Sequence, residues 1–347
     1  MYIPKYTINN KILKNIGVIE AGREIITNAP LVPAWEKKFR EEAIVRTVHH
    51  GTHIEGNELN RTEAEKVIKG EDVVGRARDI QEILNYRNVL KFLESIEESD
   101  KKITEEVIKK IHLLTTDNIL DPQKTGKYRN TQVVVKNSIT GEITFRPPPA
   151  VEVPYQIEDF VSWLSSLGKD DIHPVLKAGI IHHEVVRIHP FVDGNGRVAR
   201  SIATLSLFLD NYDIKKFFYL EEYYDRDAER YYDALKSAES GDLTDWLAYF
   251  TEGLAIELSR IKEKIQKLSI DIHLKEKLGG KQVFLNDRQI QVIEYIQKMG
   301  YIQNSVFQDL FPKISEDTVL RDLHDLMKKG IIKKEGKTKA ARYILRA

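Results

Sequence analysis

A run of twelve residues, HPFVDGNGRVAR at 189–200, brings together the side chains of a phosphate-handling site. His189 can act as a general base, because an imidazole titrates close to neutral pH. Asp193 offers a carboxylate for Mg²⁺, which proteins bind through one or two carboxylates together with phosphate oxygens. Arg197 and Arg200 lie three positions apart, so on a helix both guanidinium groups can reach the same side and neutralise phosphate charge.

The glycines of the same run supply the backbone of an anion site. Gly194, Asn195 and Gly196 permit unusual backbone angles, so successive N–H groups can point into one concavity where a helix begins. Unpaired amides and aligned peptide dipoles at a helix N-terminus bind phosphate. Base, metal ligand, anion site and two cations therefore predict a nucleotide phosphate-transfer site. The alternative, a glycine-rich connection with no further role, does not explain the combination.

The run resembles the motif of the Fic family, His-Pro-Phe-x-Asp-Gly-Asn-Gly-Arg-x-x-Arg, at every specified position. The resemblance extends over roughly residues 40–260 and implies an all-helical core with a β-hairpin flap. It also implies adenylyl transfer, in which ATP donates AMP to a Ser, Thr or Tyr hydroxyl of a protein and pyrophosphate leaves. ATP and Mg²⁺ are then the cofactors, and the partner is a protein substrate, with the chain itself among the candidates.

The resemblance assigns a role to each residue of the motif. His189 removes the proton of the attacking hydroxyl, and Asp193 holds Mg²⁺ across the α- and β-phosphates. The residues that cradle or neutralise the phosphates are Gly194, Asn195, Gly196, Arg197 and Arg200. Phe191 anchors the loop in the core. The protein contributes mainly positioning and electrostatic stabilisation, as is usual for phosphoryl chemistry.

Two further segments match the family. The sequence TQVVVKNSITGEITF at 131–145, followed by three prolines, matches the flap, whose backbone holds the target segment by strand addition. Val133 in this segment is a candidate cofactor-binding residue. Tyr231 and Tyr232 match the segment that closes the adenine pocket, and two amphipathic core aromatics are an equally good explanation of these tyrosines.

The segment Gly51-Thr-His-Ile-Glu55-Gly-Asn57 resembles the inhibitory motif of the family, [Ser/Thr]-x-x-x-Glu-[Gly/Asn], placed before the core. This resemblance implies that Glu55 pairs with Arg200 and blocks the productive pose of the γ-phosphate. The motif has Ser or Thr four residues before the Glu, where this chain has Gly51, and Thr52 is the nearest substitute. A plain helix end is the alternative explanation.

Histidines outside the motif invite a metal interpretation. His49, His50 and His53 lie at a predicted helix end with Glu55 as the one nearby carboxylate, which favours solvated or capping side chains over a metal site. His182 and His183 precede the motif on a predicted helix and are expected to pack beneath it.

Helical periodicity dominates the segments that must carry these residues. Predicted helices cover 35–50, 76–97, 102–118, 154–167, 174–187, 226–238 and 242–268, one begins after Asn60 in a capping box with Glu63, and one follows Gly196. Residues 131–136 and 143–146 read as the two strands of a hairpin. The fold class predicted is mainly α.

The C-terminal residues differ from the body in charge. From Lys281 onward the chain has 13 Lys and Arg against eight Asp and Glu. Residues 285–347 fit a small α+β winged helix-turn-helix, with three helices, Ser315 as a cap, and two strands around a basic wing. This favours DNA as a partner, whereas Asp322 and Asp325 on the candidate recognition helix favour a protein contact.

Composition limits the remaining possibilities. The 347 residues are 41% hydrophobic, carry 53 basic and 53 acidic side chains, and include no cysteine. This excludes a basic coat protein, thiolate catalysis and cysteine-based zinc sites. No apolar run is long enough for a membrane span and no secretory signal is present, so we expect a cytoplasmic protein without a membrane partner.

The domain organisation expected has four parts. Residues 1–100 form an N-terminal helical region with the inhibitory motif, 101–268 the catalytic core with supporting helices, 269–284 a linker, and 285–347 the winged helix. The favoured function is an autoinhibited protein adenylyltransferase. Two alternatives stay open: an enzyme that mainly removes AMP, in which Glu55 positions water, and a DNA-binding regulator with a nucleotide-sensing core. A homodimer is also left open.

Overall fold

The computed structural model describes residues 2–29, 31, 33–98, 102–136, 143–168, 171–267, 285–312, 314–336 and 341–346. The chain forms two compact units. The first unit comprises Met1–Thr27 and Glu41–Lys262, and the second comprises Asn28–Arg40 and Glu263–Ala347. The predicted linker at 269–284 lies outside the described residues, as does the loop of the predicted hairpin.

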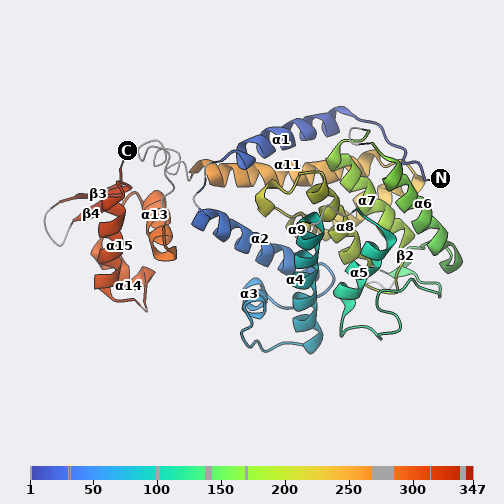
Figure 1. The fold of residues 1–347 in the computed structure, drawn as a ribbon, viewed down its shortest axis with the longest axis horizontal. Coiled ribbons are helices and arrows are strands. Elements are labelled where there is room, and N and C mark those ends of the chain that lie inside the picture. Colours follow the sequence, from blue (N-terminus) through green and yellow to red (C-terminus); the bar gives the residue numbers. More distant parts are fainter. Residues whose placement is uncertain are drawn as a thin grey trace. The chain divides into compact units, whose positions relative to one another are not determined.

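The fold is mainly α, as the sequence predicts (Figure 1). The helices up to the end of the first unit are α1 (Asn10–Thr27), α2 (Pro33–His53), α3 (Arg61–Lys69), α4 (Ala77–Glu98), α5 (Glu105–Thr116), α6 (Val153–Ser166), α7 (Pro174–Ile188), α8 (Asn195–Leu209), α9 (Glu221–Arg226), α10 (Ala228–Ser237) and α11 (Thr244–Lys267). Single 3₁₀ turns occupy Ala150–Glu152, Ile214–Lys216 and Ala238–Ser240.

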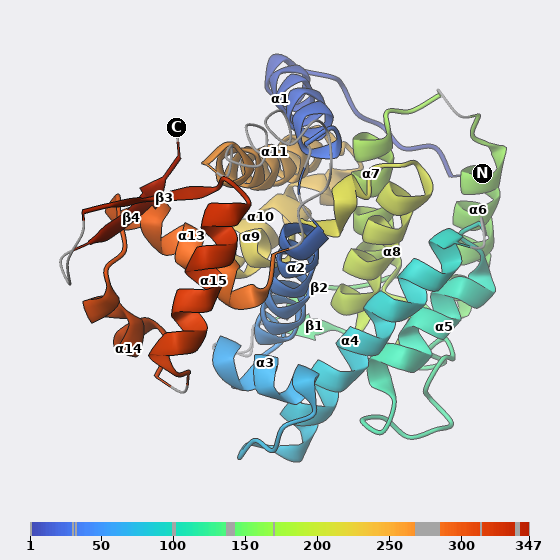
Figure 2. The ribbon, with the colours of Figure 1, turned by 60° about the vertical axis from the view of Figure 1, so that its left-hand side comes forward.

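Helices α7 and α8 pack against each other (Figures 1 and 2). The motif at 189–200 begins at the end of α7 and continues into α8. On α8, Val198, Ile202 and Leu205 are fully buried, and their spacing of three and four residues puts them on one apolar face. Helices α4 and α5 pack on α8 as well. The loop between α7 and α8 is therefore held at the end of a rigid pair of helices.

Helix α3 begins as the sequence predicts. The side chain of Asn60 accepts hydrogen bonds from the N–H groups of Thr62 and Glu63, and Glu63 accepts one from the N–H of Asn60 at 2.8 Å. Gly70 ends the helix in the left-handed conformation, with φ at 80°. The capping box is thus confirmed.

Two elements depart from the predicted helices. The predicted helix 226–238 is α10, which begins after Asp227, whose side chain accepts a hydrogen bond from the N–H of Arg230, and the short α9 before it was not expected. Helix α1 was not expected at all. Its buried residues include Ile12, Ile19 and Ile26, which recur every seven positions among polar ones and pack its inner face.

The hairpin is shorter than predicted. Strands β1 (Val135–Lys136) and β2 (Ile143–Phe145) pair antiparallel, with Val135 opposite Phe145. Continuing this register toward the N-terminus of β1 would bring Val133 and Gln132 opposite Pro147 and the prolines after it, which have no N–H to donate. Val133 therefore lies just before the strand.

The second unit holds α13 (Asp287–Met299), a 3₁₀ turn at Asn304–Val306, α14 (Phe307–Leu310), α15 (Glu316–Lys328) and the antiparallel strands β3 (Ile332–Glu335) and β4 (Arg342–Leu345). These elements follow the predicted order. Ser315 precedes α15, but its hydroxyl contacts the Thr318 hydroxyl at 2.9 Å instead of capping a backbone N–H.

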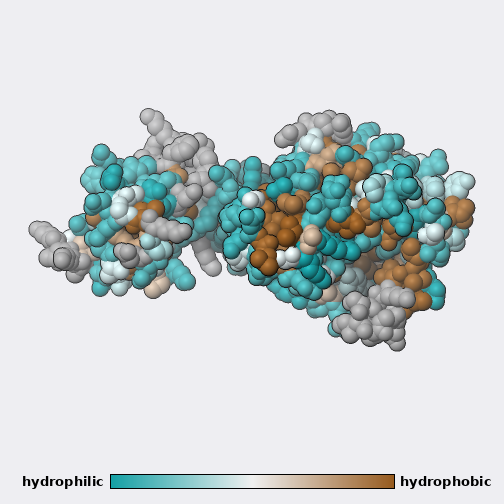
Figure 3. All heavy atoms as spheres, turned by 90° about the horizontal axis from the view of Figure 1, so that it is seen from below, coloured by the Kyte–Doolittle hydropathy of each residue, from teal (hydrophilic) through white to brown (hydrophobic). Residues whose placement is uncertain are grey.

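Apolar side chains also reach the surface. On the face drawn in Figure 3, brown apolar residues form separate patches between teal polar ones. The most exposed large apolar side chains of the first unit include Val74, Val151 and Tyr155. Within the part of the chain that the structure describes, no helix combines the length and hydropathy needed to cross a membrane.

Candidate active site

The loop between α7 and α8 turns through two left-handed residues. His189 ends α7 with φ at 50°, and Gly194 precedes α8 with φ at 77°. A Cβ at Gly194 would lie 3.2 Å from the Cγ2 of Thr116, so glycine suits both the backbone angle and the close packing. This turn places the N-terminus of α8, with its unpaired amides, a few residues after His189.

His189 is set up to accept a proton. Its Nδ1 lies 3.3 Å from the carbonyl oxygen of Val186, which can only accept, so Nδ1 carries the hydrogen and Nε2 is left with a lone pair. Burial lowers the pKa of His189 to about 4. The imidazole is therefore neutral at pH 7, as a general base requires.

Phe191 and Asn195 hold the loop in shape. Phe191 is fully buried, which confirms its predicted role as an anchor. The side-chain amide of Asn195 accepts from the N–H of Phe191 and donates to its carbonyl, both at 2.9 Å. Asn195 is buried, and its side chain is committed to the loop, so phosphate contacts at this position fall to the backbone amides of α8.

His112 on α5 supports the same loop, and sequence reasoning missed it. Its ring stacks on Phe191 with centroids 3.8 Å apart. Its Nδ1 accepts from the N–H of Gly126, so Nε2 carries the hydrogen and donates to the carbonyl of Asp193 at 3.1 Å. Burial lowers the pKa of His112 to about 4, which keeps this tautomer neutral.

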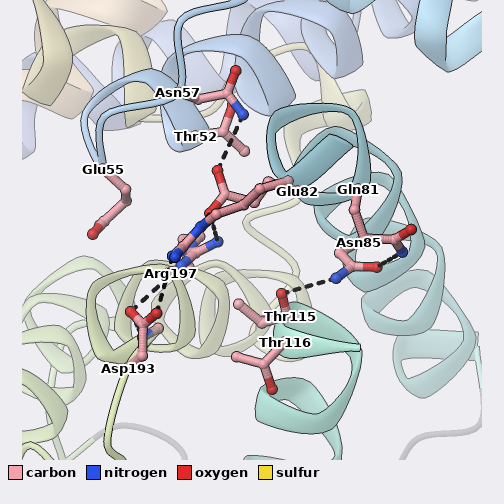
Figure 4. A network of polar contacts seen from close by, with 12 residues as sticks. Thr52, Glu55, Asn57, Gln81, Glu82, Asn85, Thr115, Thr116, Asp193 and Arg197 are labelled. Carbon is pink, nitrogen blue, oxygen red and sulfur yellow. Dashed lines mark hydrogen bonds and ion pairs between the residues drawn. The ribbon is translucent and has the colours of Figure 1, made fainter. Parts of the chain in front are cut away.

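Asp193 lies in a network of opposite charges (Figure 4). Its Oδ1 accepts from the N–H of Gly194 at 2.6 Å, and its Oδ2 accepts from Nη2 of Arg78 at 3.1 Å. The buried guanidinium of Arg197 lies 3.7 Å from Asp193 Oδ1 and 3.3 Å from Glu82 Oε1. Neither Arg78 nor Glu82, both on α4, was predicted from the sequence.

Arg200 and Glu55 form the ion pair that the inhibitory motif implies. Nη2 of Arg200 donates to Oε1 of Glu55 and to the carbonyl of Gly51, each at 2.9 Å. A Cβ at Gly196 would lie 2.5 Å from that same Glu55 oxygen. The Glu55 carboxylate therefore lies over the first turn of α8, where an anion is stabilised by the helix dipole.

Gly51 is explained by the packing around it. A Cβ at this position would come within 2.3 Å of the Tyr86 ring and 3.0 Å of Glu221. The Tyr86 hydroxyl donates to Glu221 at 2.7 Å, and burial raises the pKa of Glu221. The suggested substitute, Thr52, donates instead to the Val48 carbonyl of its own helix at 2.9 Å. The Gly51 carbonyl is the group at this turn that meets Arg200.

The two tyrosines of the predicted adenine pocket have different environments. Tyr231 is 2% exposed, and its hydroxyl lies 2.8 Å from Nε2 of His182 in a cluster with Tyr224 and Trp246. Tyr231 is thus a core aromatic in this structure, whereas Tyr232 is 49% exposed and has surface available for a ligand. His182 and His183 are both buried, as expected.

Arg129 ties the base of the hairpin to the loop, and no sequence pattern points to it. Its backbone N–H donates to the Pro190 carbonyl at 2.9 Å, and its Nε donates to the His189 carbonyl at 2.8 Å. Its Nη2 donates to the Pro148 carbonyl at 2.6 Å. Its Nη1 donates to the Thr131 carbonyl at 3.3 Å, so one side chain joins the residues on both sides of the hairpin to the end of α7.

The histidines at the end of α2 bind an acid of α9. His50 Nδ1 and His53 Nδ1 each lie 2.7 Å from an oxygen of Asp225, and burial lowers the pKa of His49 to about 4. Among the described residues, no group of three or more His, Cys, Asp or Glu could hold a metal ion.

Solved structures share this architecture. A Fic family protein from Desulfovibrio desulfuricans G20 aligns over 99% of this chain and 98% of its own, with a TM-score of 0.66 and 24% identity. Fic-1 (residues 134–508) from C. elegans aligns over 74% of each chain, with a TM-score of 0.61 and 24% identity. At these identities the likeness establishes the fold, which is mainly helical and of the Fic type.

The sequence comparisons find one family. Residues 102–207 match the model of the Fic/DOC family. "Protein adenylyltransferase Fic" from Nematostella vectensis is 27% identical over 244 residues, or 67% of this chain and 52% of its own length. The protein of the same name from Culex quinquefasciatus is 26% identical over 270 residues, or 76% and 51%. The chain spans about half the length of these curated relatives.

Proposed function

We propose that this protein is a protein adenylyltransferase, which transfers AMP from ATP to a Ser, Thr or Tyr hydroxyl of a protein. The names of the curated relatives support the reaction class. The observation that carries the proposal is that His189, neutral and with its Nε2 lone pair free, ends α7 at the loop that leads through Asp193 to Arg197 and Arg200 on α8.

The transfer step follows from these positions. The target hydroxyl oxygen attacks the α-phosphorus of ATP and gives its proton to Nε2 of His189. The bond from the α-phosphorus to the bridging oxygen breaks, and pyrophosphate leaves with the electron pair. Because the imidazole is neutral at pH 7, the proton acceptor is available without prior ionisation.

Arg197 and the first amides of α8 receive the phosphate oxygens. Arg197 is 2% exposed, and its Nε makes no hydrogen bond to any described residue. A buried donor without a partner is costly, so an incoming phosphate oxygen gains a hydrogen bond and satisfies that group. Arg200 can do the same for the terminal phosphate once Glu55 withdraws from it.

Asp193 fits a Mg²⁺ site of the kind that phosphates complete. Its Oδ1 is held by the N–H of Gly194, and Oδ2 faces outward to the exposed side chain of Arg78. Bound Mg²⁺ would neutralise charge that develops on the α- and β-phosphates. Since no group of three or more His, Cys, Asp or Glu in the described part of the chain could hold a metal ion, the nucleotide would have to supply most of the metal's ligands.

Glu55 makes the resting protein inactive in this proposal. Its carboxylate pairs with Arg200 and lies over Gly196. The side chain of Arg200 is 1% exposed and that of Glu55 is 24% exposed. A γ-phosphate and this carboxylate are both anions that need Arg200 and the first turn of α8. They cannot occupy that position together, so release of Glu55 would be required for productive ATP binding.

A second proposal concerns residues 285–347, for which DNA binding is favoured over a protein contact. Asp322 of α15 is 7% exposed and bonds Arg288 and Asn286 of the same unit, and Asp325 bonds Gln289 and Lys329. Asp322 is therefore turned inward, and the charge of Asp325, whose side chain is 46% exposed, is balanced by Lys329. Beyond its acidic first turn (Glu316 and Asp317), the exposed side chains of α15 include Arg321, His324 and Lys328, which suit a phosphate backbone.

The transfer proposal is tested with ATP labelled on its α-phosphate. In a background that lacks Glu55, replacement His189→Ala should abolish label transfer to protein and leave ATP binding within a factor of about three, since the base acts on the hydroxyl and not on the nucleotide. Normal transfer by this variant would contradict the role of His189.

A further inference from the structure

We propose that Arg78 is the counter-ion that Asp193 exchanges for the metal, so that Arg78 sets how strongly nucleotide binding depends on Mg²⁺. This inference rests on the proposed function, because it concerns the metal-binding carboxylate of that site. The family motif does not include Arg78, which lies on α4, 115 positions before Asp193.

The first observation is that Arg78 holds the oxygen a metal needs. Oδ1 of Asp193 is engaged by the N–H of Gly194 at 2.6 Å, which leaves Oδ2 as the freer oxygen. Nη2 of Arg78 lies 3.1 Å from that Oδ2. A guanidinium and a divalent cation cannot bind the same lone pairs at once, so metal binding requires Arg78 to move away.

The second observation is that Arg78 can leave while its neighbours cannot. The side chain of Arg78 is 59% exposed, whereas those of Arg197 and Glu82 are 2% and 4% exposed. Glu82 is fixed by Arg197 at 3.3 Å and by the side-chain amide of Asn57 at 3.1 Å (Figure 4). Arg78 bonds Glu82 through Nε at 3.1 Å, so it stays at the edge of the site after it releases Asp193.

The charges of the network give the direction of the effect. Two carboxylates, Asp193 and Glu82, are balanced by two guanidinium groups, those of Arg78 and Arg197. A divalent cation at Asp193 would add charge beside both arginines, and the exposed one relieves the repulsion by withdrawing. Removing Arg78 should therefore favour the metal-bound state, while a merely supporting role for Arg78 would make metal binding weaker.

The test compares affinities and does not depend on turnover. Isothermal titration calorimetry of the full chain gives the Kd of ADP with EDTA and with saturating Mg²⁺. The Kd with EDTA divided by the Kd with Mg²⁺ measures how strongly ADP binding depends on the metal. ADP is used because Glu55 opposes only the γ-phosphate. For Arg78→Gln we expect this ratio to rise by about two- to fivefold, the range of an exposed ion pair.

A matched control uses the neighbouring arginine. Arg76 is 54% exposed and bonds Asp79 at 2.9 Å, but it makes no contact with Asp193. The ratio for Arg76→Gln should equal that of the unsubstituted chain. The ratio for Arg78→Lys, which keeps the charge, should lie between those of the unsubstituted chain and Arg78→Gln. These results together support the exchange.

Other outcomes overturn it. A ratio for Arg78→Gln that is unchanged or reduced would show that Arg78 does not compete with the metal, and would leave the proposed function standing. An equal rise of the ratio in Arg76→Gln would show that the loss of any positive charge in this region has the same effect, and would overturn the specific role of Arg78. If the unsubstituted chain binds no ADP under either condition, the nucleotide site fails, and the proposed function fails with it.

Discussion

Nη2 of Arg200 lies 2.9 Å from Oε1 of Glu55, and the same nitrogen donates to the Gly51 carbonyl. Arg200 comes from the first turns of α8 and Glu55 from the turn that follows α2, so this pair joins two segments 145 positions apart. It also holds a carboxylate at a helix N-terminus, where we expect a phosphate during catalysis.

Replacement Gly51→Ala should loosen the inhibitory pair. The added methyl group would come within 2.3 Å of the Tyr86 ring, so either that ring or the end of α2 must shift. Since the Gly51 carbonyl accepts from Arg200, a shift of the turn weakens the hold on Glu55. We expect labelled AMP transfer to rise above that of the unsubstituted chain. Gly17→Ala serves as a control on α1, because a Cβ there meets nothing within 4 Å. Equal transfer by both variants would contradict this reading of Gly51.

The pH dependence of catalysis should reflect the low pKa of His189. Burial lowers this pKa to about 4, and the base works only when unprotonated. For Glu55→Gly, kcat/KM should therefore stay level as pH falls from 7 to about 5 and drop only as pH approaches 4. Half-maximal kcat/KM near 6.5, the ordinary value for histidine, would contradict the assignment.

The control for that profile is the stability of the fold. His112 and His183 are also buried with pKa values of about 4, below the ordinary histidine value. Their neutral forms belong to the folded state, so stability is fully present above about pH 6.5 and is lost progressively as pH falls toward 4. Circular dichroism at each pH separates loss of structure from protonation of the catalytic base.

Phe191→Ala should destabilise the first unit by about 3–5 kcal/mol, the usual cost of truncating a buried aromatic. Phe191 is fully buried and stacks on His112, and its backbone is held by Asn195. Tyr155→Ala is the matched control, because Tyr155 is 70% exposed and its loss should cost little. Thermal unfolding of the two variants measures the difference, and equal midpoints would show that Phe191 does not anchor the loop.

DNA binding by residues 285–347 should depend on salt through the wing. Each Lys or Arg that contacts a phosphate should steepen the slope of log K against log salt by about 0.9. Lys333, Lys334, Lys337 and Lys339 should all contribute, and their joint replacement by Ala should weaken binding to every sequence and flatten the slope. A gel-shift titration of the full chain at two salt concentrations measures this, with AMP transfer as the control. No shift at low salt would leave a protein contact as the better account.

The motif could be predicted because its residues are contiguous. His189, Asp193, Arg197 and Arg200 fall within one loop and the first two turns of one helix, so their spacing alone brings them together. The pair of Glu55 with Arg200 followed from the family resemblance and not from spacing. Helix α7, with its strong apolar character, agrees with the predicted range 174–187 to within one residue, and α8 begins close to the predicted start at Gly196.

The supporting residues could not be predicted, because ordinary side chains acquire their roles through long-range packing. His112 contacts the Asp193 carbonyl over 81 positions and Arg129 contacts the His189 carbonyl over 60. Neither lies in a pattern that distinguishes it from a surface residue. Asn195 shows the opposite error, since its place in the motif suggests a phosphate ligand while its side chain is bonded to Phe191.

The central claim, an adenylyltransferase restrained by Glu55, is tested most directly by intact-mass analysis after incubation with Mg²⁺ and ATP. The unsubstituted chain, Glu55→Gly, and Glu55→Gly combined with His189→Ala are compared. We predict that Glu55→Gly gains one or more AMP moieties, that the unsubstituted chain gains far fewer, and that the double variant gains none. A Glu55→Gly protein that incorporates no more AMP than the unsubstituted chain would contradict the account.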